Sequence, residues 1–274
     1  MRKDYIPVSP GGRESEITFI EERWTDTWRR RRLSALSTLL VPFRPEYRVM
    51  APYIRQLPPN ARMLDGGCGL GEWTVNLSRV GYHVLGLDIS EETVTRLQKA
   101  FPGAIFERGD IRDTGQPDDS FEAYFSWGTF EHFEEGMQSC TNEAFSIIRP
   151  GGYLFTSVPF ENLPVQRSSG SYDAGQESQE NRRWRFYQWR LTKAELHDQL
   201  MQSGFQVLEI RSIHKRQGAV RVLNQEFGLP WHWLFTRVLS MILAPFLSAD
   251  IFAHMLIAVA RKPSTPLRAT IVIE

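Results

Sequence analysis

The chain has 274 residues, enough for one substantial hydrophobic core with additions around it. Its 32 Lys and Arg residues balance 32 Asp and Glu residues, so no overall positive field favours nucleic acid as a partner. The two cysteines, Cys68 and Cys140, exclude a fold built on disulfide bonds. Residues 1–5 are polar and lack the apolar core of a signal peptide, so a reducing, cytoplasmic setting is expected.

The first 57 residues are predicted to form a helical extension. Residues 1–13 carry Pro and Gly and are expected to be loosely held. Residues 14–57 favour two helices, which Pro42 and Pro45 would separate.

The first of these helices carries two tryptophans and a basic run. Trp24 and Trp28 precede four consecutive arginines, residues 29–32. A solvated helix face is the commoner structure for such a run. Contact with an acidic head group or a phosphorylated substrate is the alternative.

A glycine-rich loop follows the first predicted strand of the main domain. Residues 63–71 read Met-Leu-Asp-Gly-Gly-Cys-Gly-Leu-Gly. Glycine tolerates a positive φ and lets the backbone lie directly against a ligand. A strand that ends in such a loop and continues as a helix creates a nucleotide-sized binding edge at the carboxyl end of a sheet.

Two kinds of nucleotide are compatible with such a loop. A dinucleotide-binding loop has the spacing G-x-G-x-x-G and holds a pyrophosphate. Here the spacing is G-x-G-x-G, and Asp65 at the end of the strand would repel a diphosphate. The acid favours a ligand that carries positive charge and amines, and an ordinary glycine-rich turn is the remaining alternative.

Further strands follow at regular intervals. The next one ends in Asp88, about 20 residues past the loop, where a carboxylate can accept hydrogen bonds from both ribose hydroxyls. Ser90 is then predicted to cap a helix with Glu91 and Glu92 in its first turn. Three more strands are predicted. The first, at about 104–107, precedes Gly109-Asp110-Ile111, and the second, at 121–126, precedes residues 127–133. Residues 149–158 give a helix end, a glycine turn and then the last of the three strands.

At five motifs the chain resembles the class I S-adenosylmethionine-dependent methyltransferases: residues 65–71, Asp88, 109–111, 127–132 and 149–152. The resemblance is closest to the small-molecule, ubiquinone-biosynthesis-like branch (methyltransferase type 11). It covers about residues 45–215, with a final strand near 251–261. It implies a Rossmann-like three-layer α/β sandwich, in which a seven-stranded, mostly parallel sheet has one antiparallel strand, with N-terminal helices and a helical insertion before the last strand.

The resemblance also implies which residues bind S-adenosylmethionine. Asp65 would orient the methionine amino group, Asp88 the ribose diol and Asp110 the adenine amine, although a plain turn residue is the alternative for Asp110. Ser126 and Trp127 would form the floor under the sulfonium. The implied cofactor-binding residues are Asp65, Gly66, Gly67, Gly69, Asp88, Ile89, Asp110, Ile111, Ser126 and Trp127.

Catalysis needs few side chains under this interpretation. If the acceptor is a hydroxyl, a base must remove its proton, and His132 is the best-placed candidate. Shaping the loop is the alternative role. Some relatives bind a metal through E-x-x-E-H, but residues 128–132 read Gly-Thr-Phe-Glu-His, so no metal is predicted. Residues 126–129 also differ from the N/D-P-P-Y tetrad of enzymes that methylate nucleic-acid bases.

The methyltransferase domain is expected to span residues 58–274 with two insertions. The first, 161–190, is polar and then rich in Arg and aromatic residues, and is predicted to be a substrate lid. The basic and aromatic residues of 182–190 would grip a substrate, or would be a loop-to-helix junction with aromatics packed inward. Thr192 and Glu195 then predict a capping box.

The second insertion, 216–250, is predicted to be an apolar helical cover. Within it, residues 231–247 are too short for a membrane span and are interrupted by Arg237 and Pro245. Packing onto the core is the first expectation. A lid helix, a dimer seam and peripheral contact with a membrane interface are the alternatives.

The predicted function is methyl transfer from S-adenosylmethionine to a small-molecule, glycan or lipid-like acceptor by in-line displacement. The first alternative is a non-catalytic binding or partner module with the same fold. The second is a nicotinamide-dependent oxidoreductase, which the glycine spacing and Asp65 disfavour.

Overall fold

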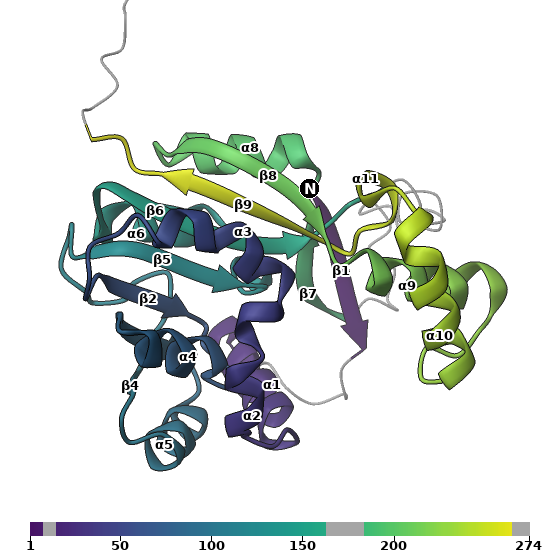
Figure 1. Cartoon of the computed structure of the whole chain (residues 1–274), viewed down its shortest axis with the longest axis horizontal. Helices are drawn as coiled ribbons and strands as arrows, with labels where there is room; N and C mark the ends of the chain where they lie inside the picture. Colours follow the sequence, from purple (N-terminus) through teal and green to yellow (C-terminus); the bar gives the residue numbers. More distant parts are fainter. Residues whose placement is uncertain (8–14, 163–183, 265–274) are drawn as a thin grey trace, which may run out of the picture.

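A seven-stranded sheet forms the centre of the molecule (Figure 1). The computed structural model describes residues 1–7, 15–162 and 184–264. In spatial order the strands are β4 (Ile105–Arg108), β3 (His83–Asp88), β2 (Arg62–Gly66), β5 (Phe121–Trp127), β6 (Ile148–Pro159), β9 (Met255–Arg261) and β8 (Gln206–Ile213). The pairs from β4 to β6 are parallel, and β9 is antiparallel to both of its neighbours. The predicted fold class is confirmed.

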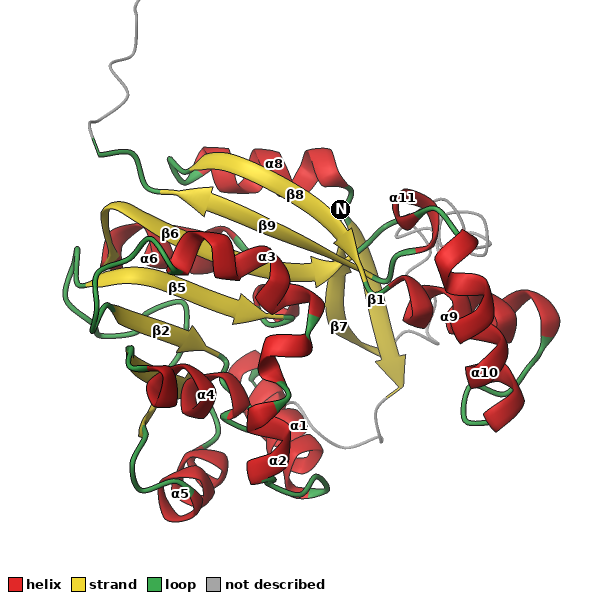
Figure 2. Cartoon of the chain, in the orientation of Figure 1, coloured by secondary structure: helices red, strands yellow, loops and turns green. Residues whose placement is uncertain are grey.

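Helices cover both faces of this sheet (Figure 2). One layer contains α3 (Pro45–Ile54), α4 (Glu72–Val80) and α5 (Glu91–Ala100), and the other contains α6 (Gln138–Ile147) and α8 (Lys193–Gln202). Successive side chains of a strand point to opposite faces. Accordingly Met63 and Phe125 pack with α3 and α4, whereas Leu64 and Tyr124 pack with α6 and α8. Both layers are therefore held by buried apolar side chains of the same strands.

Two helix starts that the sequence predicts are confirmed. The Ser90 hydroxyl accepts a hydrogen bond from the Thr93 amide at 3.2 Å and caps α5. At α8 the Thr192 hydroxyl accepts from the Glu195 amide, while the Glu195 carboxylate accepts from the Thr192 amide. These reciprocal bonds satisfy backbone donors that have no partner inside the helix.

Residues 1–7 are held by strand pairing, contrary to the prediction for 1–13, whose other residues lie outside the described ranges. Strand β1 (Arg2–Pro7) pairs antiparallel with β7 (Trp184–Arg190) in a separate two-stranded sheet. Residues 184–190 are therefore a strand, not a junction before a helix. A strand pair between residues 177 to 188 positions apart leaves no local signal, which is why sequence reasoning missed it. The rest of the proposed lid, 163–183, lies outside the described residues.

The residues between β1 and the sheet form more than two helices. They are α1 (Glu16–Arg29), α2 (Ala35–Leu39), a 3₁₀ turn η1 (Val41–Phe43) and α3. Pro42 lies in η1 and Pro45 is the first residue of α3, so the two prolines separate α3 from the earlier helices, as predicted. Proline is suited to the first position of a helix, because the missing N–H would have no helical partner there.

The second insertion is helical, as predicted. It contains α9 (Lys215–Phe227), α10 (Leu234–Leu243), η4 (Ala244–Phe246) and α11 (Ala249–Phe252). These helices stand at the right of Figure 1, beyond the ends of β6 and β8. Contrary to the first expectation for 231–247, most of the large apolar side chains of this segment face solvent: Trp231, Leu234 and Phe246 are 68%, 77% and 85% exposed. Within the described ranges, no helix is long and apolar enough to cross a membrane.

Candidate active site

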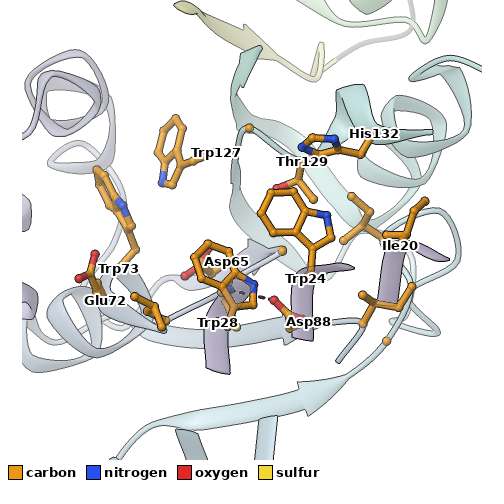
Figure 3. A pocket seen from close by; sticks show the side chains of 18 of the residues that line it. Ile20, Trp24, Trp28, Asp65, Glu72, Trp73, Asp88, Trp127, Thr129 and His132 are labelled. Atoms are coloured by element: carbon orange, nitrogen blue, oxygen red, sulfur yellow. Dashed lines mark hydrogen bonds between the residues drawn. The ribbon is translucent and has the colours of Figure 1, made fainter. Parts of the chain in front are cut away.

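A cavity of about 270 Å³ opens where β2, β3 and β5 end (Figure 3). Nine of the residues predicted from the sequence line it: Asp65, Gly67, Gly69, Asp88, Ile89, Asp110, Ile111, Trp127 and His132. The carboxyl ends of parallel strands meet at one edge of a sheet, so loops far apart in the sequence converge here.

Two predicted residues, Gly66 and Ser126, are absent from the cavity wall. The Ser126 hydroxyl donates to the Gly66 carbonyl at 2.7 Å and is fully buried. A Cβ on Gly66 would lie 2.3 Å from the Tyr124 hydroxyl. The two residues therefore support the loop from behind, and do not form the floor that the resemblance implied for Ser126.

The glycine loop has the geometry that its sequence predicts. Gly67 and Gly69 have φ of 75° and 55°, a region that other residues rarely adopt. The amides of Gly67 and Cys68 both donate to the Leu87 carbonyl, at 2.8 and 2.9 Å. The loop is thereby fixed against the end of β3.

Two buried carboxylates flank this loop. Asp65 accepts hydrogen bonds from the Thr74 amide at 3.2 Å and the Thr74 hydroxyl at 2.7 Å. Asp88 accepts from the Gly69 amide at 2.9 Å and the Ser90 amide at 3.0 Å. Burial raises the pKa of Asp65 to about 7 and that of Asp88 to about 6, although these hydrogen bonds lower both. Each site therefore gains from an occupant that supplies positive charge or donors.

Asp110 lies on the cavity wall and is paired within its own turn. Its carboxylate accepts from the Arg112 amide at 2.9 Å and from Arg112 Nη2 at 2.7 Å. The Arg112 guanidinium also stands 4.3 Å from the centre of the Phe133 ring. This pairing orients the carboxylate, and the sequence analysis did not identify Arg112.

Four tryptophans line the cavity as two pairs: Trp24 with Trp28 on α1, ring centres 5.4 Å apart, and Trp73 with Trp127, 5.0 Å apart (Figure 3). The ring of Trp28 lies so close to the glycine loop that a Cβ on Gly69 would be 2.8 Å from it. Sequence analysis missed this role of α1. The i, i+4 spacing of Trp24 and Trp28, which places them on one helix face, was the available signal.

The arginine run after Trp28 is divided between solvent and site. Arg29 is exposed and forms ion pairs with Glu92 at 2.5 Å and Asp26 at 3.0 Å. Arg31 lines the cavity, with its guanidinium 5.4 Å from the centre of the Trp28 ring. Arg29 fits the solvated-face interpretation, and Arg31 is exposed as well but also lines the cavity.

His132 lies in a short 3₁₀ turn, η2 (Phe130–His132), and its side chain is 5% exposed. Its Nδ1 is 2.7 Å from the Tyr187 carbonyl oxygen, which can only accept, so Nδ1 carries the hydrogen and Nε2 the lone pair. Burial lowers the pKa of His132 to about 4, outweighing the Tyr187 and Gly128 carbonyls, which raise it. A neutral imidazole on the cavity wall can accept a proton at pH 7.

The preceding residue, Glu131, is also buried, and its Oε1 lies 4.0 Å from His132 Nε2. Burial raises the pKa of Glu131 to about 8, so this carboxyl is largely protonated at neutral pH. It therefore adds little negative charge beside His132. In the described part of the chain, no group of three or more His, Cys, Asp and Glu side chains is placed to hold a metal.

Comparison with known proteins agrees with this geometry. Residues 63–152, which contain the glycine loop, Asp88 and His132, match the family model described as a methyltransferase domain. The chain contains a class I S-adenosylmethionine-dependent methyltransferase domain. The match spans the strands from β2 to the start of β6, which are the strands that build the cavity.

Two curated relatives match part of the chain. A probable S-adenosylmethionine-dependent methyltransferase of Mycolicibacterium smegmatis is 28% identical over 145 residues, which are 53% of this chain and 52% of that protein. Probable thiol methyltransferase 2 of Arabidopsis thaliana is 33% identical over 118 residues, 41% of this chain and 50% of that protein. The chain thus spans about half the length of these relatives.

A solved structure extends the likeness to nearly the whole methyltransferase fold. The 1,6-didemethyltoxoflavin-N1-methyltransferase of Burkholderia thailandensis, solved with bound 1,6-didemethyltoxoflavin and S-adenosylhomocysteine, superposes with a TM-score of 0.57. The alignment covers 96% of both chains at 15% identity. At that identity the comparison establishes the fold and not the substrate.

Proposed function

We propose that this chain transfers a methyl group from S-adenosylmethionine to a small acceptor with an apolar or aromatic body. The observation that carries the proposal is the pair of buried carboxylates, Asp65 and Asp88, on either side of the glycine loop. A cationic ligand with an amine and a ribose diol would satisfy both, whereas a dinucleotide would bring its diphosphate against Asp65.

The residues of the cavity fit this cofactor. Asp88 would accept hydrogen bonds from the ribose diol, and Asp65 would orient the amino group. The glycine loop lies between the two carboxylates, and its Gly67 and Gly69 line the cavity. The buried Trp127 Nε1 has no hydrogen-bond partner among the described residues. When bound, S-adenosylmethionine supplies a methyl group that its sulfonium makes electrophilic.

The chain itself would position the reactants and remove one proton from the acceptor. The tryptophan pairs exclude water and hold the acceptor, and such positioning can contribute roughly 7–11 kcal/mol. If the acceptor is a hydroxyl, His132 Nε2 would take its proton as the acceptor oxygen forms its new bond to carbon. The Tyr187 carbonyl would stabilise the resulting imidazolium through Nδ1.

The aromatic lining supports an amphiphilic acceptor, such as a glycan or lipid-linked sugar. The rings of Trp24 and His132 pack edge to face with their centres 4.9 Å apart, so an apolar surface lies directly beside the candidate base. An acceptor would therefore present its nucleophile next to a ring or chain that packs on Trp24.

The test is to incubate the enzyme and methyl-labelled S-adenosylmethionine with a cell extract and to analyse the metabolites by mass spectrometry. The expected result is a labelled product that carries one additional methyl group, in an organic-solvent-soluble fraction. Binding of S-adenosylhomocysteine without any labelled product would instead support the non-catalytic binding module.

A further inference from the structure

Helix α10 has polar residues inside and apolar residues outside. Thr236 and Ser240 are fully buried at positions i and i+4, on the side that packs toward the protein. The opposite side presents Leu234, Phe235, Val238, Met241 and Ile242, which are 45% to 77% exposed. A helix at a water-facing surface has the reverse arrangement.

Neighbouring residues enlarge this surface. Trp231 and Trp233, just before α10, are 68% and 51% exposed. Phe227, which precedes α10 in the sequence, and Phe246, which follows it, are 70% and 85% exposed. We call the exposed large apolar side chains of residues 227–246 the outer face. The elements that carry these side chains, α9, α10 and η4, contact one another, and a large exposed apolar surface marks a site of interaction.

The outer face is also nearly free of charge. Charged residues make up 23% of the whole sequence, yet residues 228–249 contain one, Arg237, and no acid. Arg237 is exposed. Glu226, which is also exposed, precedes Phe227, but within residues 227–246 the one charged side chain is positive, which complements an anionic partner.

The position of the outer face separates it from the cavity. None of residues 216–250 lines the candidate active site, and α9 and α10 stand beyond the carboxyl ends of the strands, where the cavity also opens (Figure 1). Substitutions in the outer face can therefore test binding without altering the cavity wall.

The chemistry of this surface favours a lipid bilayer over a protein. A helix of 10 residues is about 15 Å long, half of the hydrocarbon thickness, so it can lie in the interface but cannot span it. Tryptophans and a cation beside an apolar helix face are typical of interfacial helices. A protein–protein interface would offer a polar rim with hydrogen-bonding groups, which residues 228–249 largely lack.

We propose that the outer face docks the protein onto a bilayer that carries anionic head groups. The helix would lie in the plane of the membrane, with the apolar side chains of α10 among the upper acyl chains and Trp231 and Trp233 at head-group depth. The proposal does not depend on methyl transfer, and it places the cavity beside a source of amphiphilic molecules.

Flotation of the full chain with vesicles tests the proposal. With vesicles of phosphatidylcholine and phosphatidylglycerol the protein should float, and with phosphatidylcholine alone it should float less. Phe235→Ser combined with Ile242→Ser should lower partition by about tenfold or more, because two apolar side chains leave the lipid. Arg237→Glu should reduce binding mainly to the anionic vesicles.

Matched controls make the result specific. Val80→Ser with Ile105→Ser removes two side chains, at the end of α4 and on the edge strand β4, that are 59% and 60% exposed, against 62% and 58% for Phe235 and Ile242. This control should float like the unaltered chain, and circular dichroism melting should show both double variants folded. The proposal is overturned if the unaltered chain stays at the bottom with both vesicle types, or if both double variants lose binding equally. A dimer that the Phe235 and Ile242 changes dissociate, without flotation, would assign the surface to a second copy and also overturn it.

Discussion

At the scale of single residues, the raised pKa values of Asp65 and Asp88 predict how cofactor binding depends on pH. In the free cavity burial raises these pKa values from 3.8 to about 7 and about 6, so both groups hold protons below that window. A ligand that offers amines and hydroxyls favours the ionised form, and binding would release the protons. Affinity for S-adenosylhomocysteine should therefore rise from pH 5 to about 7 and then level off.

Calorimetry at several pH values, in buffers of different ionisation enthalpy, measures both the affinity and the protons released. In Asp88→Asn the rise in affinity near pH 6 should vanish, while the rise near pH 7, which belongs to Asp65, remains. An affinity that is flat across this range would show that these carboxyls do not meet the ligand.

His132 gives a second prediction at this scale. If it acts as a base, His132→Ala should lower turnover of a hydroxyl acceptor by roughly 10²–10⁴-fold and leave S-adenosylhomocysteine affinity unchanged. Because the pKa of His132 is about 4, this group should not limit kcat/KM above about pH 5. Turnover within about tenfold of the unaltered enzyme would assign His132 to the shape of the loop.

At the scale of elements, α1 is predicted to be part of the cofactor site and not only an extension. Trp28→Ala removes the ring that covers the glycine loop near Gly69, and should weaken S-adenosylhomocysteine binding by about tenfold. Isothermal calorimetry measures the change. Trp231→Ala, an exposed tryptophan outside the cavity, serves as the control and should bind normally. Equal binding by both variants would place α1 outside the site.

The capping box of α8 predicts a stability effect. Thr192→Ala removes the hydroxyl that accepts from the Glu195 amide, and should lower the free energy of unfolding by about 1 kcal/mol. Thermal melting should show a Tm lower by about 2–4 °C. Thr27→Ala, in the last turn of α1, should leave Tm unchanged or slightly higher, because alanine favours helix. A similar loss in both variants would contradict a specific role of the cap.

At the scale of the whole molecule, local patterns predicted the central sheet and the edge where the cavity opens. Asp65 and Asp88 end neighbouring parallel strands, so the pleat and the strand order alone bring them to one place. The pairing of β1 with β7 and the position of α1 over the loop depend on contacts between distant segments. Such contacts are set by tertiary packing, and Trp24 and Trp28 gave only an indirect sign of them.

The second insertion shows another limit of sequence reasoning, because an apolar segment that was expected to be buried is exposed. The apolar composition of 231–247 predicts burial by the usual rule, yet α10 turns Thr236 and Ser240 inward and exposes its apolar side. Hydrophobicity alone cannot distinguish a core helix from one that binds an external partner. The inward position of two small polar residues at i, i+4 is the feature that distinguishes them here.

The central claim is that the acids at the ends of β2 and β3 bind a cationic sulfur nucleotide. Calorimetry of the purified chain with S-adenosylhomocysteine and with NADH tests it most directly. The account predicts binding of S-adenosylhomocysteine, no binding of NADH, and a loss of about tenfold or more in Asp88→Asn, as expected when a hydrogen bond to a charged group is removed. Binding of NADH with no affinity for S-adenosylhomocysteine would contradict it.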